Sequence, residues 1–198
     1  MQLLKKALEQ NGFSVYLANT KEEALQISKT MLTDVKTIGL GGSVSVVEIG
    51  LLDYLTKQKD IKLHNQYESG ISMEENLKRR REGLLSDLYI TSSNAITKDG
   101  ILVNADGSGN RVAAQIFGPK KVLLIVGKNK IVDTIEEGFK RIMEYVAPKN
   151  CDRMNKKLQD MGKEPHYNLE NIANKFTYIN GDEKGRTHII LVEEELGY

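Results

Sequence analysis

The sequence predicts an α/β fold in which a mainly parallel sheet lies between two layers of helices, as one domain over residues 1–198. Segments with helical periodicity alternate with short apolar runs, which is typical of parallel strands joined by helices. The run Val122–Val126 is continuously apolar, so we expect a central strand that is buried on both faces. With 40% hydrophobic residues, the chain can form one core.

The first half of the chain contains three helix–strand pairs. Gly12 ends a first helix, LLKKALEQ, and SVYLA follows as a strand. Thr20 and Glu23 match a capping box and predict a helix over residues 21–32, which leads to the strand TIGLGG. We expect one helix in SVSVVEIGLLDYL, a short strand in IKLHN and a charged amphipathic helix in ISMEENLKRRREGLLS.

The second half continues the alternation and adds a hairpin. Two strands, DLYITSSNAI and ILVNA, flank a turn at 98–100, which predicts an antiparallel pair. RVAAQIF is predicted as a helix over residues 111–117 with Asn110 as its N-cap, and IVDTIEEGFKRIMEYV as a long helix that Pro148 ends. The polar residues 150–186 are expected to form an ordered but irregular excursion before a last strand, THIILV.

Composition argues against several classes of function. The 28 basic and 27 acidic residues leave a net charge of +1, so no overall field attracts nucleic acid or an anionic membrane. No stretch approaches the roughly 20 apolar residues of a membrane span, and the start does not resemble a signal peptide, so we expect a cytoplasmic protein. Cys151 is the only cysteine, and His64, His166 and His188 are scattered, so the sequence predicts no metal site and no redox cofactor.

Three glycine-rich turns follow predicted strands and are candidate ligand-binding segments. In an open α/β sheet, the turns at the carboxyl ends of the strands share one edge, where ligands bind. Glycines allow close approach of the backbone to a ligand, and free N–H groups at a helix start favour an anion. The candidate binding residues are Gly41, Gly42, Ser43, Ser45, Asn94, Gly107, Gly109, Asn110, Arg111, Gly127, Asn129 and Lys130.

Ordinary helix capping is the alternative explanation for these turns. Ser45 and Glu48 match an S-x-x-E capping box, which would account for both residues. Basic residues are harder to explain, because a cation at a helix N-terminus opposes the helix dipole. Arg111 and Lys130 are both expected at such positions, and the anion that compensates Arg111 could be Asp106 or a ligand.

The same segments resemble the lactate-utilisation (LUD) domain family, of the LutC/YkgG type. GGSVSVVEIGLLDYL is similar to the family segment GGSxTxxEIGL, SSNAITKDGILVNADGSGNRVAAQIFGPKKVLLIVGKNKIV to its longest block, and VAPKN and LVEEELGY to later landmarks. The resemblance implies the fold of the ribose-phosphate isomerase, glucosamine-phosphate deaminase and CoA-transferase group (NagB/RpiA/CoA-transferase-like). It also implies a place in bacterial lactate oxidation beside two iron–sulfur partner proteins. Many relatives have a cysteine-rich segment after the VAPKN landmark, whereas residues 154–186 contain no cysteine.

Three functions follow from these observations. The resemblance predicts a non-redox component of lactate or 2-hydroxy-acid utilisation that binds a small anionic metabolite, with iron–sulfur proteins and a second copy of the chain as candidate partners. A second reading is a stand-alone enzyme of the isomerase, CoA-transferase or folate cyclo-ligase-like group, with Glu48 or Asp106 as its catalytic carboxylate. A third is a regulatory protein that binds an anionic metabolite without converting it.

Overall fold

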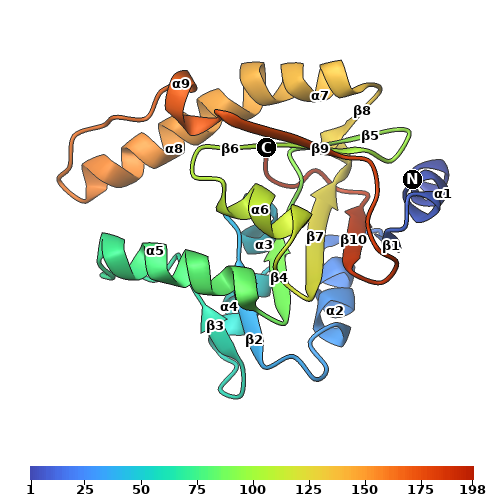
Figure 1. The fold of residues 1–198 in the computed structure, drawn as a ribbon, viewed down its shortest axis with the longest axis horizontal. Helices are drawn as coiled ribbons and strands as arrows, with labels where there is room; N and C mark the ends of the chain where they lie inside the picture. Colours follow the sequence, from blue (N-terminus) through green and yellow to red (C-terminus); the bar gives the residue numbers. More distant parts are fainter.

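The computed structural model describes residues 1–198 and contains two sheets with helices around them (Figure 1). The larger sheet has the strand order β1-β10-β7-β4-β2-β3, and every neighbouring pair is parallel. This confirms the predicted α/β fold with a mainly parallel sheet. The six strands are β1 (Ser14–Ala18), β2 (Thr37–Leu40), β3 (Lys62–His64), β4 (Leu88–Thr91), β7 (Lys121–Gly127) and β10 (Thr187–Val192).

β7 lies inside this sheet, between β10 and β4, as its apolar run predicts. Val122, Leu124 and Val126 pack into one core cluster, while Leu123 and Ile125 pack into another on the opposite face. The sheet is therefore covered on both sides. One face packs against α2 (Lys21–Thr30), α3 (Val44–Glu48) and α4 (Leu51–Thr56), and the other against α1 (Gln2–Gln10) and the second sheet.

The second sheet was not predicted as a unit. Its strands are ordered β8-β5-β6-β9, with β5 and β6 forming the predicted antiparallel hairpin, which turns at Gly100. β8 lies where the start of a long helix was predicted, and β9 lies in the segment predicted to be irregular. The four strands are β5 (Ala95–Thr97), β6 (Leu102–Asp106), β8 (Ile131–Val132) and β9 (Lys175–Ile179).

The long helix does not end at Pro148, which corrects the prediction. α7 (Ile135–Arg141) continues through a π-helical segment, Ile142–Val146, into α8 (Ala147–Asp160). Pro148 lies in the first turn of α8, where a missing N–H group costs little because the π-helical segment has already shifted the hydrogen-bond register. Residues 150–186 are accordingly more regular than predicted: they contain most of α8, α9 (Leu169–Ile172) and β9.

One smaller difference has a local cause. The predicted helix SVSVVEIGLLDYL is divided into α3 and α4, because Gly50 adopts a left-handed conformation with φ of 76°. The remaining helices are α5 (Met73–Glu82), as predicted in outline, and α6 (Asn110–Ile116). None of these helices combines the length and the apolarity needed to cross a bilayer.

Candidate functional site

The three glycine-rich turns meet at the carboxyl edge of the larger sheet through side-chain hydrogen bonds. Lys130, after β7, reaches Ser45, after β2, and also Ser92 at the end of β4. Arg111, after β6, reaches the carbonyl of Ser92 and the side chain of Asn94. Residues from four strands that are far apart in sequence therefore lie in one polar cluster.

Lys130 is the most deeply buried cation of this cluster. Its side chain is only 3% exposed, and its Nζ lies 2.9 Å from Ser45 Oγ and 2.9 Å from Ser92 Oγ. Burial, followed by the positive charges of Arg141 and Arg111, lowers the pKa of Lys130 to about 7. Lys130 was predicted at the start of the long helix. It instead ends a 3₁₀ turn at Lys128–Lys130, which directs its side chain inward. The prediction that Lys130 opposes a helix dipole is therefore wrong.

Arg111 is held entirely by the protein. Its Nε donates to Asp106 Oδ1 at 2.9 Å, and its Nη2 donates to Asn94 Oδ1 at 2.7 Å and to the Ala105 carbonyl at 2.6 Å. Its Nη1 donates to the Ser92 carbonyl and to Asn104 Oδ1, both at 3.2 Å. Arg111 thus ties β4, β6 and α6 together, and Asp106 is the anion that compensates its charge.

Asp106 also performs the capping that was predicted for Asn110. Its Oδ2 accepts the backbone N–H groups of Arg111 at 2.9 Å and Val112 at 3.1 Å, while Gly109 takes the N-cap position. Asn110 instead accepts a hydrogen bond from Arg80 and donates one to the hydroxyl of Tyr89. Both carboxylate oxygens of Asp106 are occupied, so this candidate catalytic residue has an evident structural role.

Arg141 completes the set of cations and was not singled out from the sequence. It projects from the end of α7, where its Nε donates to the Asn129 carbonyl at 3.2 Å and its Nη1 to the Asn94 carbonyl at 2.8 Å. Its Nη2 makes no hydrogen bond within the chain, and burial lowers its pKa. We refer to Arg111, Lys130 and Arg141 as the cationic cluster; only Arg111 has a carboxylate in direct contact.

The first glycine-rich turn is fixed by a tyrosine. Ser43 caps α3 by accepting the N–H of Val46, and its own N–H donates to the hydroxyl of Tyr67 at 2.6 Å. The same hydroxyl donates to the Gly41 carbonyl at 3.0 Å, and burial raises the pKa of Tyr67. Gly41 lies so close to β4 that a Cβ atom would come within 2.5 Å of Thr91 Oγ1. A glycine at position 41 therefore allows the end of β2 to pack closely against β4.

The predicted capping box of Ser45 and Glu48 is not formed. Ser45 Oγ donates to the Leu196 carbonyl at 3.2 Å, and Glu48 Oε2 accepts the N–H of Gly197 at 2.7 Å. Asn129 binds the same segment, since its Oδ1 accepts the N–H of Leu196 and its Nδ2 donates to the Gly197 carbonyl. Three candidate ligand or catalytic residues therefore hold the segment that follows β10.

The remaining predicted glycines border the cluster in different ways. Gly127 allows the segment after β10 to approach, since a Cβ would lie 2.5 Å from the Leu196 nitrogen. Gly107 packs against the backbone of Asn171. Gly109 has φ of 93°, and Gly42 is exposed, with open space where a side chain would be.

Four residues of the site were missed in the sequence: Tyr67, Ser92, Asn104 and Arg141. Ser92 precedes the predicted Asn94 by two residues at the same strand end, and this placement could have identified it. Asn104 is buried within β6, and Arg141 and Tyr67 lie in segments whose proximity to the turns depends on long-range packing. No local sequence signal marks these three residues.

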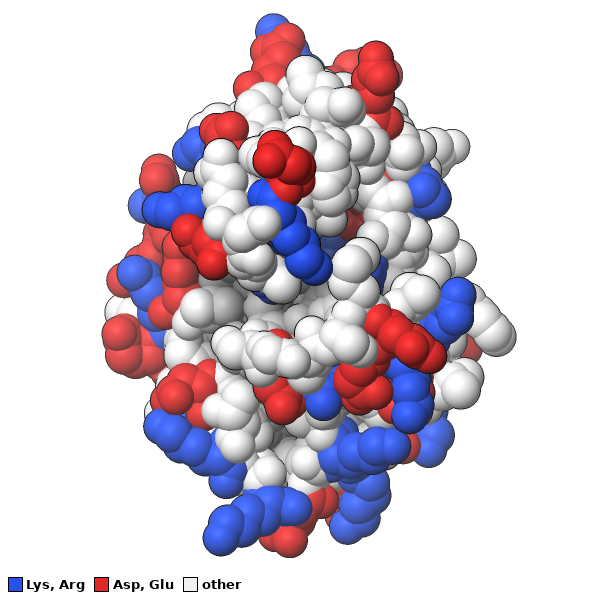
Figure 2. All heavy atoms as spheres, turned by 90° about the vertical axis from the view of Figure 1, so that its left-hand side faces the viewer, with Lys and Arg blue, Asp and Glu red and all other residues white.

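The face that carries the tips of α5 and α8 is hollowed near its centre, and blue atoms of Lys or Arg are visible inside the hollow (Figure 2).

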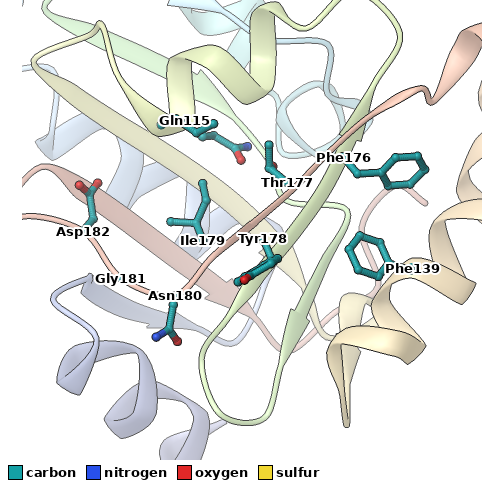
Figure 3. Close-up of a pocket in the computed structure, with 10 residues that line it drawn as sticks. Gln115, Phe139, Phe176, Thr177, Tyr178, Ile179, Asn180, Gly181 and Asp182 are labelled. Atoms are coloured by element: carbon teal, nitrogen blue, oxygen red, sulfur yellow. The ribbon is translucent and has the colours of Figure 1, made fainter.

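A separate groove lies between α6, α7 and β9 (Figure 3). Phe139 and Phe176 meet edge to face there, and the one charged lining residue, Asp182, is paired with Arg186. Nowhere do three His, Cys, Asp or Glu side chains come together as a metal site requires.

Comparisons with known proteins agree with this architecture. The structure resembles the crystal structure of a DUF162 family protein from Deinococcus radiodurans with a TM-score of 0.55 and 16% sequence identity, over 96% of this chain and 94% of that chain. A search of curated proteins gave no match. The family model for the LUD domain matches residues 1–192, so the chain belongs to the LUD domain family.

Proposed function

We propose that this chain is a non-redox component of a lactate or related 2-hydroxy-acid utilisation system in the cytoplasm, and that it binds a small organic anion at the cationic cluster. The observation that carries the proposal is the imbalance of charge at the carboxyl edge of the sheet. Three basic side chains lie together there, and only Arg111 is paired with a carboxylate. Buried cations without counter-ions are costly, so an anionic ligand would stabilise the site.

The unused donors of the cluster suit a carboxylate. Arg141 offers its Nη2, and Lys130 has donor capacity beyond its bonds to Ser45 and Ser92 when it is protonated. Guanidinium groups bind carboxylates with charge-assisted hydrogen bonds, which are stronger than neutral ones. Gly42 in the first turn is exposed and Arg141 is half-buried, whereas Lys130 is buried.

Calorimetric titration of the purified chain with lactate and pyruvate tests this proposal. Arg141→Gln should weaken binding by about 10- to 100-fold, since a hydrogen bond to a charged group contributes about 1.5–3 kcal/mol. Lys120→Gln is the matched control: it removes the same charge from an exposed side chain near the opposite end of β7 and should leave the affinity unchanged. Equal affinities of the two variants would contradict the assignment of the anion to the cluster.

The carboxylate-dependent enzyme is less well supported by the contacts. Asp106 is engaged by Arg111 and by two backbone N–H groups, and Glu48 binds the segment after β10. In the proposed system, electron transfer belongs to iron–sulfur partner proteins, and this chain supplies the organic-acid site. Co-purification with such partners is the corresponding test of assembly.

A further inference from the structure

One group of side chains in the site has a possible reactivity that anion binding does not use. Lys130 Nζ lies 2.9 Å from two serine hydroxyls, and all three side chains are almost completely buried. A buried amine next to a serine hydroxyl can accept its proton and make the oxygen nucleophilic. We propose that Ser92 and Lys130 form a nucleophile–base pair that cleaves an acyl ester or thioester of a small organic acid.

The hydroxyl groups of the two serines bind different parts of the fold. Ser45 Oγ donates to the Leu196 carbonyl, so its contact with Lys130 is one in which the serine accepts. Ser92 Oγ likewise donates to a backbone carbonyl at 3.2 Å, but to that of the adjacent residue Ser93. Rotation of the Ser92 hydroxyl toward a neutral Lys130 breaks only this local bond, whereas the same rotation at Ser45 would release the segment after β10. Ser92 is therefore the donor to Nζ, while Ser45 fixes the position of the amine.

The surroundings favour both the neutral amine and the negative charge that develops in acyl transfer. Burial and the neighbouring guanidinium groups of Arg141 and Arg111 destabilise the ammonium form of Lys130 by more than the carboxylate of Glu48 stabilises it, so the base is available near neutral pH. Arg111 contacts the carbonyl of Ser92, and Arg141 contacts that of Asn94. Their charges lie beside the nucleophile, where they would stabilise the oxyanion of a tetrahedral intermediate.

The reaction balances without a cofactor or a redox step. Ser92 Oγ attacks the acyl carbon while its proton passes to Lys130 Nζ, and collapse of the tetrahedral intermediate transfers that proton to the departing alcohol or thiol. Lys130 then takes a proton from water as the water attacks the acyl-serine ester, and returns that proton to Ser92 Oγ when the second tetrahedral intermediate collapses, which releases the organic acid and restores the free hydroxyl and the neutral amine. The inference rests on the proposed function in that the released acid is the anion assigned to the cationic cluster.

Labelling with a fluorophosphonate, followed by peptide mass spectrometry, tests the pair directly. The expected result is a single adduct on Ser92, whose rate of formation rises with pH through about 7, where Lys130 loses its proton, and then levels off. Ser92→Ala should abolish the adduct. Lys130→Arg keeps the charge but cannot act as a base, and should slow labelling by at least about 100-fold. Ser28→Ala removes an equally buried serine in α2 and should change nothing.

Ser45→Ala provides a readout that does not depend on the substitution of Lys130. Loss of an acceptor for the ammonium form should move the midpoint of the pH–rate profile to lower pH while labelling of Ser92 persists. Four results would each contradict the assignment of Ser92 and Lys130 as nucleophile and base. They are an unmoved midpoint, labelling at another residue, equal labelling of the Lys130→Arg variant, and no labelling at any pH. Carboxylate binding without labelling would leave the proposed function intact, whereas labelling of a chain that binds neither lactate nor pyruvate would remove the proposed function alone.

Discussion

Lys130 carries a stability cost that depends on pH. Its pKa of about 7 in the folded chain lies below the unfolded value of 10.5, so the unfolded state binds more protons between these values. The resulting decrease in the free energy of unfolding is fully present below about pH 7 and disappears as the pH rises toward 10.5. Lys130→Met should therefore raise the free energy of unfolding by about 1–4 kcal/mol at pH 6 and by less at pH 9. Urea unfolding measures both values. Lys128→Met, in the same turn but exposed, is the control and should have little effect at either pH.

Asp106 and Glu48 are the two carboxylates that the sequence offers as catalysts, and their contacts predict different costs of substitution. Asp106→Asn leaves the buried guanidinium of Arg111 without its counter-ion and should destabilise the chain by about 3–5 kcal/mol. Glu48→Gln keeps an oxygen that can accept the N–H of Gly197 at an exposed position and should cost less than about 1 kcal/mol. Thermal unfolding of both variants measures the difference, and equal losses would contradict the structural role assigned to Asp106.

At the scale of elements, two glycines at turns around β2 and α3 act for different physical reasons. Gly50 divides α3 from α4 with a positive φ, and a Cβ atom there would meet only Leu25 at 3.9 Å. Gly50→Ala should therefore cost about 1–2 kcal/mol of backbone strain. Gly41→Ala places a Cβ 2.7 Å from that of Thr91 and should cost more, because β2 and β4 must separate. Chemical denaturation of the two variants compares them; a smaller loss for Gly41→Ala would refute this close-packing argument.

The parallel sheet was predictable from the sequence because its signals are local. Apolar runs such as Val122–Val126 and capping residues such as Thr20 specify their own elements, and the structure agrees with them. The second sheet was not, because β8 has two residues and the polar strand β9 is defined only by its pairing with β6. The π-helical segment before Pro148 likewise depends on packing rather than on local propensity.

The candidate site was partly predictable for the same reason. Glycines after buried strands indicate the correct edge of the sheet, and Lys130, Asn94 and Arg111 lie in one polar cluster there. What each side chain contacts depends on partners far away in sequence. The segment around Leu196 occupies hydrogen-bonding groups that the turns alone left available for a ligand.

For the whole molecule, the sizes of the three core clusters predict the order in which its parts open. Fifteen and eleven buried residues pack on the two faces of the larger sheet, but only eight join the second sheet to α7 and α8. Less buried apolar surface means a lower free energy of local opening. β9 also lies at a sheet edge, with Phe176 42% and Tyr178 61% exposed.

Native-state hydrogen exchange should therefore separate the two sheets. Amides of β7 and β10, whose apolar residues from Val122 to Val126 and from Ile189 to Val192 are all 0% exposed, should exchange only with global unfolding. Amides of β9 and α9 should exchange through a smaller opening with weaker dependence on denaturant. Since Asn94, Arg111 and Arg141 join the second sheet and its helix to the edge of the larger one, an organic anion bound there should slow this smaller opening. Equal protection of β9 and β7 in the free chain would show that the molecule opens as one cooperative unit.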